Sequence, residues 1–393
     1  MRPAARLQAA ITLLDEIIAA ARDGGASADM LASAFFRARR YAGSKDRRAI
    51  RDLTWSAIRR FGERPATARS AFAAMADADA ELAALFDGSD YGPAVLTADE
   101  PRAVGGVIPD WIKSYLPELL DEAEITALLG RAPLDLRVNR LQASVDIVMT
   151  ALPEAQRLAL CDDALRLPTG FPIEKHALMT DGHVDIQDVG SQLIAAACRA
   201  ESGMTILDLC AGAGGKTLAL AAHMGGKGTL IAADINRDRL AQLGPRAQRA
   251  GAGNVETRLL NPKQEAAMLS DYTGQCDVVL IDAPCSGSGT WRRNPETRWR
   301  LNESRLGAVV AEQARIMEYA AKMVRPAGHL VYAVCSLLEV EGAGQIAQFL
   351  SANPGWKAQD PAIRAGRASG EGIILTPFHD GSDGFFMARL QKL

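Results

Sequence analysis

The second half of the chain alternates short apolar runs with glycine-rich or polar loops and helical stretches, in a regular order. Each apolar run has the length of a buried strand, and the helical stretch after it supplies a crossover connection. Units of this kind build a parallel sheet with helices on both faces. The predicted strands cover residues 205–209, 229–233, 255–260, 278–281 and 330–334. The expected fold class is therefore α/β, with a doubly wound, Rossmann-like parallel sheet.

The beginning of the chain has a different pattern. Residues 5–64 carry apolar side chains at helical spacing, broken at Gly24-Gly25 and at Gly43, which predicts an all-helical domain. Within it, residues 37–64 hold ten basic and three acidic side chains, a local charge of +7. Such a segment favours a polyanion partner. A solvated helix face is the alternative.

The middle of the chain mixes both kinds of element. We expect a helix at 111–120, a strand at 134–138 and a helix at 145–152, which is typical of a small α/β module. Gly105-Gly106 is a plausible linker before it. The predicted domains are therefore 1–105, 106–185 and 186–393.

The composition is that of a globular protein of two or three domains. The 393 residues are 48% hydrophobic and 23% charged, with a net charge of −3. No stretch approaches the roughly 20 apolar residues of a membrane helix, so we expect no membrane span and no signal peptide. The six cysteines are scattered without a C-x-x-C pair. This spacing argues against a disulfide framework or a zinc site and fits a reduced, cytoplasmic location.

The loop after the first predicted strand, DLCAGAGGKT at 208–217, has three glycines that let a ligand approach the backbone. A P-loop is excluded because its first glycine would fall on Cys210, and the pattern G-x-G-x-x-G lacks its last glycine. Asp234 ends the next strand, where an acidic residue commonly binds ribose hydroxyls. These features favour S-adenosylmethionine, a nucleoside cofactor without phosphate. A tight turn and a solvated Asp234 are the alternative.

Two cysteines follow predicted strands at the edge where such sheets bind ligands. Cys285 lies in the segment DAPCSGSG after strand 278–281, and Cys335 follows strand 330–334. A free cysteine is usually a core residue. Two cysteines at this edge make core packing a weaker explanation, so we expect them to carry chemistry.

Several strings in the chain resemble the RNA cytosine-C5 methyltransferases, in particular bacterial 16S ribosomal RNA enzymes of the Sun/RsmB type. The matching strings span residues 186–393 in the order of the family: QDVGSQ (187–192), DLCAGAGGKT (208–217), DAPCS (282–286), RRNP (292–295), CS (335–336) and DGFFMA (383–388). Upstream, PDW (109–111) and LRVNR (136–140) are similar to the connecting module of these enzymes. The basic start, DRRA (46–49) through Arg59-Arg60, is similar to a NusB-like RNA-binding domain.

The resemblance implies a role for each matching residue. In the family a cysteine thiolate adds to C6 of cytosine, so that C5 can take a methyl group from S-adenosylmethionine. Carried over, Cys335 is the nucleophile, Cys285 assists release, Asp282 hydrogen-bonds the cytosine edge and Lys216 faces the same pocket. DNA cytosine methyltransferases attack with the other cysteine, which leaves Cys285 as the alternative nucleophile. No metal is implied, and the implied cofactor contacts are Cys210, Ala211, Gly212, Ala213, Gly214, Gly215, Lys216, Asp234, Arg239, Asn261 and Asp282.

The chain departs from the family pattern at three positions. Ala213 stands where proline is usual, Asn261 where an aspartate usually meets the adenine amino group, and Val334 where threonine usually precedes the nucleophile. The amide oxygen of Asn261 still accepts a hydrogen bond, so weaker cofactor binding is expected rather than none.

RNA contacts are expected after the Cys285 loop, where basic residues would bind phosphates: Arg292, Arg293, Arg298, Arg300 and Arg305. Trp291 and Trp299 would either stack on bases or pack against helices. We therefore expect a monomeric, cytoplasmic enzyme that makes 5-methylcytosine in RNA, with 16S ribosomal RNA as the expected substrate. Transfer RNA is the alternative substrate. A catalytically silent RNA-binding assembly or antitermination factor is the alternative function.

Overall fold

The computed structural model describes all 393 residues, which form two compact units. The helical unit comprises Met1–Gly130 with Thr290–Glu303, and the sheet unit comprises Arg131–Gly289 with Ser304–Leu393. Residues 290–303 thus pack with the helical unit although they lie between two strands of the sheet unit. The division into three domains at 105 and 185 stays a prediction.

Amphipathic helices form the helical unit. Its α-helices are α1 (Pro3–Asp23), α2 (Ala28–Ala38), α3 (Ser44–Arg60), α4 (Ala68–Ala76), α5 (Ala80–Ala83) and α6 (Glu122–Ala127). Leu7, Leu14 and Ile17 of α1 are fully buried in its core, as their spacing predicts. Gly24 ends α1 in the left-handed conformation, and the hydroxyl of Ser27 accepts a hydrogen bond from the N–H of Met30 to begin α2.

One expectation for residues 105–120 is wrong. The helix expected at 111–120 is a short 3-10 helix, Asp110–Tyr115, because Leu116 is extended and Pro117 follows it. At the predicted linker, the N–H of Gly106 donates to the carbonyl of Arg60. The chain therefore stays packed against the first helices beyond residue 105.

A small antiparallel sheet begins the sheet unit. Its strands β1 (Leu134–Val138), β2 (Gln156–Arg157), β3 (Ala164–Leu167) and β4 (Val184–Ile186) have the order β2-β3-β1-β4. Helices α7 (Val145–Ala151) and α8 (Ala177–Thr180) accompany it, with Val148 and Leu178 in the shared core. The strand predicted at 134–138 is confirmed as β1, and the helix predicted at 145–152 is confirmed as α7.

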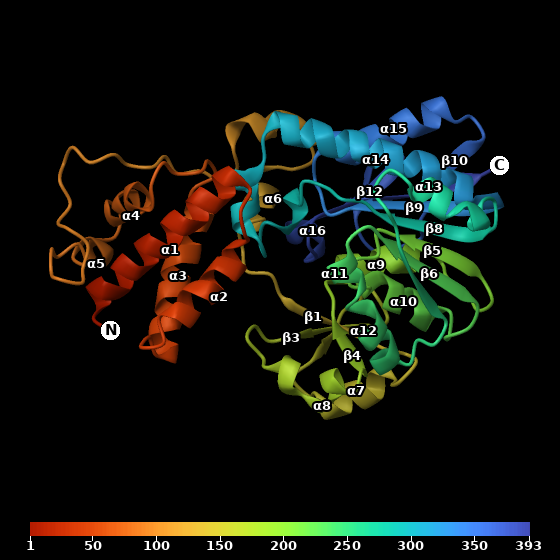
Figure 1. The fold of residues 1–393 in the computed structure, drawn as a ribbon, viewed down its shortest axis with the longest axis horizontal. Coiled ribbons are helices and arrows are strands. Elements are labelled where there is room, and N and C mark those ends of the chain that lie inside the picture. Colours follow the sequence, from red (N-terminus) through yellow and green to blue (C-terminus); the bar gives the residue numbers. More distant parts are fainter. The chain divides into compact units, whose positions relative to one another are not determined.

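The large sheet has the predicted parallel core and an antiparallel extension. Its parallel strands β7 (Val255–Leu259), β6 (Thr229–Asp234), β5 (Thr205–Leu209), β8 (Cys276–Asp282) and β9 (Val324–Val334) lie side by side in this order (Figure 1). Strand β13 (Phe385–Lys392) pairs antiparallel with β9 and continues the sheet to β12 (Gly372–Leu375) and β11 (Arg367–Ser369), while β10 (Trp356–Gln359) pairs with β13. The parallel strands were predicted from the sequence, and the antiparallel ones were not.

Helices cover both faces of this sheet (Figure 1). Alternate residues of β5 point to opposite faces, so Ile206 packs with α9 (Val189–Ala197), α10 (Gly215–His223) and α12 (Leu243–Ala250). Leu207 packs on the other side with α14 (Glu303–Met323) and α15 (Ala343–Ala352). The remaining short helices are α11 (Arg237–Leu240), α13 (Glu265–Met268) and α16 (Pro377–Asp380). The doubly wound α/β fold is therefore confirmed. None of the helices is both long and apolar enough to span a membrane.

Candidate active site

A pocket of about 460 Å³ opens at the carboxyl ends of the parallel strands. The chain runs outward from β5 to β6 and β7, then returns to place β8 on the other side of β5. Ligands bind in doubly wound sheets at such a reversal. Predicted site residues line the pocket at the ends of four strands: Cys210, Asp234, Asp282, Cys285 and Cys335.

The glycine loop joins β5 to α10 beside this pocket. Cys210, Gly212 and Gly214 all have positive φ angles, of 66°, 58° and 85°. A Cβ at Gly214 would lie 2.1 Å from Leu243 Cδ1, so Leu243 would have to move, and the positive φ would strain any larger residue there. The N–H of Gly212 donates to Asp234 Oδ2 at 2.7 Å, which fixes this carboxylate at the end of β6.

Lys216 and Asp282 form an ion pair next to the pocket. Lys216 Nζ lies 2.8 Å from Asp282 Oδ2 and joins the first turn of α10 to the end of β8. Lys216 is buried, whereas the side chain of Asp282 is 34% exposed. Burial alone would lower the pKa of Lys216, but the charge and hydrogen bond of Asp282 outweigh burial and raise that pKa. The ammonium group therefore stays charged and holds the carboxylate in place.

Asp208 is fully buried below the glycine loop and does not line the pocket. Its Oδ2 accepts a hydrogen bond of 2.5 Å from Thr217 Oγ1. Burial raises the pKa of Asp208 to about 7, against the opposing effect of the Thr217 hydrogen bond. Asp208 therefore acts as a support beneath the loop.

The two predicted catalytic cysteines are in direct contact. Cys285 follows β8 and Cys335 follows β9, and their Sγ atoms lie 3.2 Å apart although 50 residues separate them in sequence. Both are free thiols and partly exposed. The contact with Cys335 and burial raise the pKa of the Cys285 thiol well above its ordinary value. Cys285 therefore keeps its proton, and either sulfur can be the donor in the contact between the two thiols.

The residues that follow the two cysteines are tied together by Glu341, which the sequence did not single out. Glu341 is fully buried, and its carboxylate accepts hydrogen bonds from the N–H of Ser286 (2.8 Å), Gln313 Nε2 (2.9 Å) and Ser336 Oγ (2.5 Å). Ser336 also shares hydrogen bonds with the hydroxyls of Ser286 and Ser288. This buried network fixes the two cysteine loops relative to each other.

The structure does not place every predicted cofactor residue on the pocket wall. Arg239 lines the pocket, but residues 211–215, Lys216 and Asn261 do not. Asn261 is exposed, and its Nδ2 contacts Gln264 Oε1 at 3.4 Å. Wall residues that the sequence reasoning missed are Ile235, Asn236, Leu260, Glu265, Glu312, Ile316 and Tyr319. The helical spacing of residues 312, 316 and 319 could have indicated three of them, because these residues share one face of α14.

The basic segment after the Cys285 loop is largely structural. In the 3-10 helix Pro295–Arg300, the Arg298 guanidinium is fully buried and donates to the carbonyls of Ile58 and Phe61 at the end of α3. The indole N–H of Trp299 also donates to the carbonyl of Phe61, at 2.8 Å. The RNA contact expected of Arg298 is therefore wrong, and Trp299 has the packing role that was the alternative to stacking on a base, because the free carbonyls at a helix end attract such donors.

Two further residues of the same segment also have structural roles, and for Trp291 this was one of the two expected alternatives. Trp291 is fully buried, so it packs in the core and does not stack on a base. Arg300 donates to the carbonyls of Gly25 and Ala26 after the end of α1, at 2.8 and 2.5 Å. The segment therefore contributes its polar side chains to the ends of the first helices.

Comparisons with known proteins identify the family of this chain. Residues 195–391 match the model of the family described as 16S rRNA methyltransferase RsmB/F. The protein named ribosomal RNA small subunit methyltransferase B from Erwinia tasmaniensis is 34% identical over 266 residues, and its namesake from Pasteurella multocida is 33% identical over 292 residues. These matches cover 67% and 72% of this chain and 60% and 65% of the relatives, so the chain spans less than two thirds of their length.

Solved structures show the same fold. The structure of NSun6 from Pyrococcus horikoshii with SFG superposes with a TM-score of 0.65, at 19% identity, over 72% of this chain and 97% of the other. A methyltransferase homolog protein from the same organism gives a TM-score of 0.63 at 24% identity, over 71% and 92% of the two chains. The family model and the sequence relatives confirm the resemblance seen in the motifs. This chain belongs to the 16S rRNA methyltransferase RsmB/F family.

Proposed function

We propose that this protein transfers a methyl group from S-adenosylmethionine to C5 of a cytosine in 16S ribosomal RNA. The observation that carries the proposal is the 3.2 Å contact between Cys285 Sγ and Cys335 Sγ at the mouth of the pocket. Attack on cytosine C6 and release of the product are separate tasks, and two adjacent thiols supply a group for each. Membership of the RsmB/F family supports ribosomal RNA as the substrate.

The pocket suits S-adenosylmethionine. Its volume of about 460 Å³ is in the range of small-molecule sites. Asp234 would accept from the ribose hydroxyls, while Leu260 and Ile235 would pack against the adenine. Four carboxylates line the pocket against the single guanidinium of Arg239, although three of them are ion-paired: Asp282 with Lys216, and Glu265 and Glu312 with Arg315. With these cationic partners counted, the site carries one net negative charge, which favours a cation such as a sulfonium over a phosphate. When bound, the cofactor supplies an electrophilic methyl group.

The side chains of this protein would then act on the base. The Cys335 thiolate adds to C6 and forms a C–S bond, which makes C5 nucleophilic. The neutral Cys285 thiol donates a hydrogen bond to Cys335 before the attack, and Asp282, held by Lys216, hydrogen-bonds the polar edge of the ring. On release the C5 proton passes to water, its electron pair forms the C5=C6 double bond, and the C–S bond breaks with its pair returning to the sulfur of Cys335. We assign assistance in release to Cys285.

More than one part of the chain would contact the RNA. The exposed basic residues of the helical unit, among them Arg37, Arg40, Lys45 and Arg48, offer charges for phosphates. A target base must leave its stack to enter a pocket at the end of a sheet. A cytoplasmic location follows if 16S ribosomal RNA is the substrate.

Bisulfite sequencing of ribosomal and transfer RNA tests this function. RNA would be compared from cells that lack the gene and from cells complemented with wild type, Cys335→Ala or Cys161→Ala. Cys161 is a partly exposed cysteine outside the pocket and serves as the matched control. We expect one protected cytosine in 16S ribosomal RNA that is lost without the gene and restored by wild type and Cys161→Ala only. Rescue by Cys335→Ala would move the nucleophile to Cys285, and an unchanged RNA pool would refute the methyltransferase function.

A further inference from the structure

Helix α12 contacts two successive residues of the glycine loop. The guanidinium of Arg246 donates a hydrogen bond of 2.6 Å from Nη1 to the carbonyl of Ala213. Leu243, at the beginning of the same helix, fills the space where Gly214 would carry a Cβ. The conformation of the loop therefore depends on where α12 lies.

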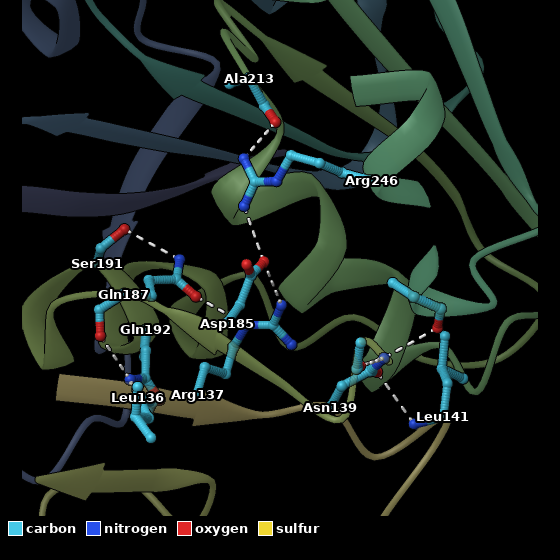
Figure 2. A network of polar contacts seen from close by, with 12 residues as sticks. Leu136, Arg137, Asn139, Leu141, Asp185, Gln187, Ser191, Gln192, Ala213 and Arg246 are labelled. Carbon is cyan, nitrogen blue, oxygen red and sulfur yellow. Dashed lines mark hydrogen bonds and ion pairs between the residues drawn. The ribbon is translucent and has the colours of Figure 1, made fainter. Parts of the chain in front are cut away.

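The small antiparallel sheet holds α12 from the other side. Arg246 Nη2 donates to Asp185 Oδ2 of β4 at 2.8 Å, so that one guanidinium joins the sheet to the loop (Figure 2). Asn139, after β1, donates from Nδ2 to the carbonyl of Ala250 at the end of the helix, at 2.9 Å. The backbone before β4 also lies directly against α12, because a Cβ at Gly182 would lie 2.3 Å from the carbonyl oxygen of Arg249.

Asp185 is itself fixed by a buried chain of polar contacts (Figure 2). Arg137 is 3% exposed, and its Nη2 lies 3.5 Å from Asp185 Oδ2. Arg137 Nε donates to Gln187 Oε1 at 2.8 Å, and Gln187 Nε2 donates to Ser191 Oγ at 3.1 Å. Buried and paired on two sides, the carboxylate of Asp185 offers Arg246 a rigid anchor.

The glycine loop requires such an anchor because its own residues restrict it little. Glycine loses more conformational freedom on ordering than any other residue, and the loop contains three. Three of its N–H groups are held: that of Ala211 by the carbonyl of Ala233, that of Gly212 by Asp234 and that of Gly214 by the carbonyl of Ala211. The carbonyl of Ala213 is held by Arg246.

We propose that Arg246 is a positioning residue for cofactor binding, which holds the glycine loop in its binding conformation, with Asp185 of the small sheet as its anchor. This inference rests on the proposed function. It makes the small sheet part of the support of the cofactor site. The loop without Arg246 would populate other conformations, and the cofactor would have to order it on binding.

Calorimetric titration with S-adenosylmethionine tests the role of Arg246 in the full-length protein. We expect Arg246→Met to bind about tenfold more weakly than wild type, the effect of losing one hydrogen bond to a charged group. Arg249→Met removes an exposed arginine from the same helix and should bind as wild type does. Hydrogen exchange of the cofactor-free proteins should be faster for residues 210–217 in Arg246→Met alone, with the rest of the sheet unit unchanged.

A second substitution separates positioning of the loop from general stability. Ala213 has no positive φ, and its N–H donates no hydrogen bond, which meets two requirements of proline, and a proline there would restrict the loop by itself. Ala213→Pro combined with Arg246→Met should recover most of the lost affinity. Equal affinities of wild type and Arg246→Met, or no recovery in the double variant, would overturn the inference while the proposed function stands. Failure of the wild-type protein to bind would overturn both.

Discussion

Glu341 accepts a hydrogen bond of 2.8 Å from the backbone N–H of Ser286, the residue that follows Cys285. The other oxygen of the same carboxylate accepts from Ser336 Oγ, and Ser336 follows Cys335. One fully buried side chain thus contacts both cysteine loops. A charge in such a place is stable only because several donors surround it.

Glu341→Leu should therefore lower the free energy of unfolding by about 3 kcal/mol, since Ser286, Gln313 and Ser336 would be left with unpaired donors. Urea unfolding followed by circular dichroism measures this change. Glu339→Leu is the matched control, because Glu339 lies in the same 3-10 turn and is exposed. Its effect should stay within about 0.5 kcal/mol. Equal destabilisation by both substitutions would contradict the role of Glu341.

The buried Asp208 predicts a distinct dependence of stability on pH. Burial raises its folded pKa to about 7, above the ordinary value of 3.8. Between these values the folded state binds more protons than the unfolded state, so this group makes stability fall as the pH rises from about 4 to about 7. Asp208→Asn removes the titration but keeps an acceptor for Thr217 Oγ1.

Relative to wild type, Asp208→Asn should therefore gain stability across this pH range, by at most about 4 kcal/mol. Thermal or urea unfolding at several pH values measures the difference between the two proteins. Asp238→Asn, in the exposed part of α11, should follow wild type at every pH. A constant difference between Asp208→Asn and wild type would show that Asp208 titrates normally.

The sequence predicts those parts of the structure that depend on residues close together in the chain. The bounds predicted for 205–209 match β5, because a buried parallel strand is an uninterrupted apolar run between polar loops. The antiparallel strands β12 and β13 were not predicted, although DGFFMA was recognised as a motif. Their pairing with β9 is a long-range contact that no local periodicity records.

The same distinction applies to the site. Because β8 and β9 are neighbours in the sheet, Cys285 and Cys335 follow strands whose carboxyl ends lie together, so their proximity could be inferred from the strand pattern. Glu341 follows Cys335 in a 3-10 turn, where nothing in the sequence marks it as buried. Arg298 lies in a basic segment whose composition is typical of a protein surface. Only the packing of residues 290–303 with the helical unit reveals that Arg298 is a core residue.

The division of labour between the cysteines predicts opposite outcomes for their alanine variants. If Cys335 attacks and Cys285 assists release, Cys285→Ala should accumulate a covalent complex between protein and RNA, and Cys335→Ala should form none. Denaturing gels with labelled 16S ribosomal RNA and S-adenosylmethionine detect the complex as a band of low mobility. Cys161→Ala should behave as wild type. A complex formed by Cys335→Ala would exchange the two roles.

We expect Arg298 to support the stability of the fold and Arg48 to support RNA binding. Arg298 donates to carbonyls at the end of α3, so Arg298→Met should lower the free energy of unfolding by about 2 kcal/mol through unpaired carbonyls and the lost charge at a helix C-terminus. Arg48 lies exposed on α3. Arg48→Met should leave stability unchanged but weaken RNA binding, and reduce the slope of log K against log salt by about 0.7 to 0.9 if it contacts one phosphate. Urea unfolding and filter binding at several salt concentrations separate the two effects. If Arg298→Met were as stable as wild type but showed a reduced slope of log K against log salt, Arg298 would be an RNA-binding residue after all.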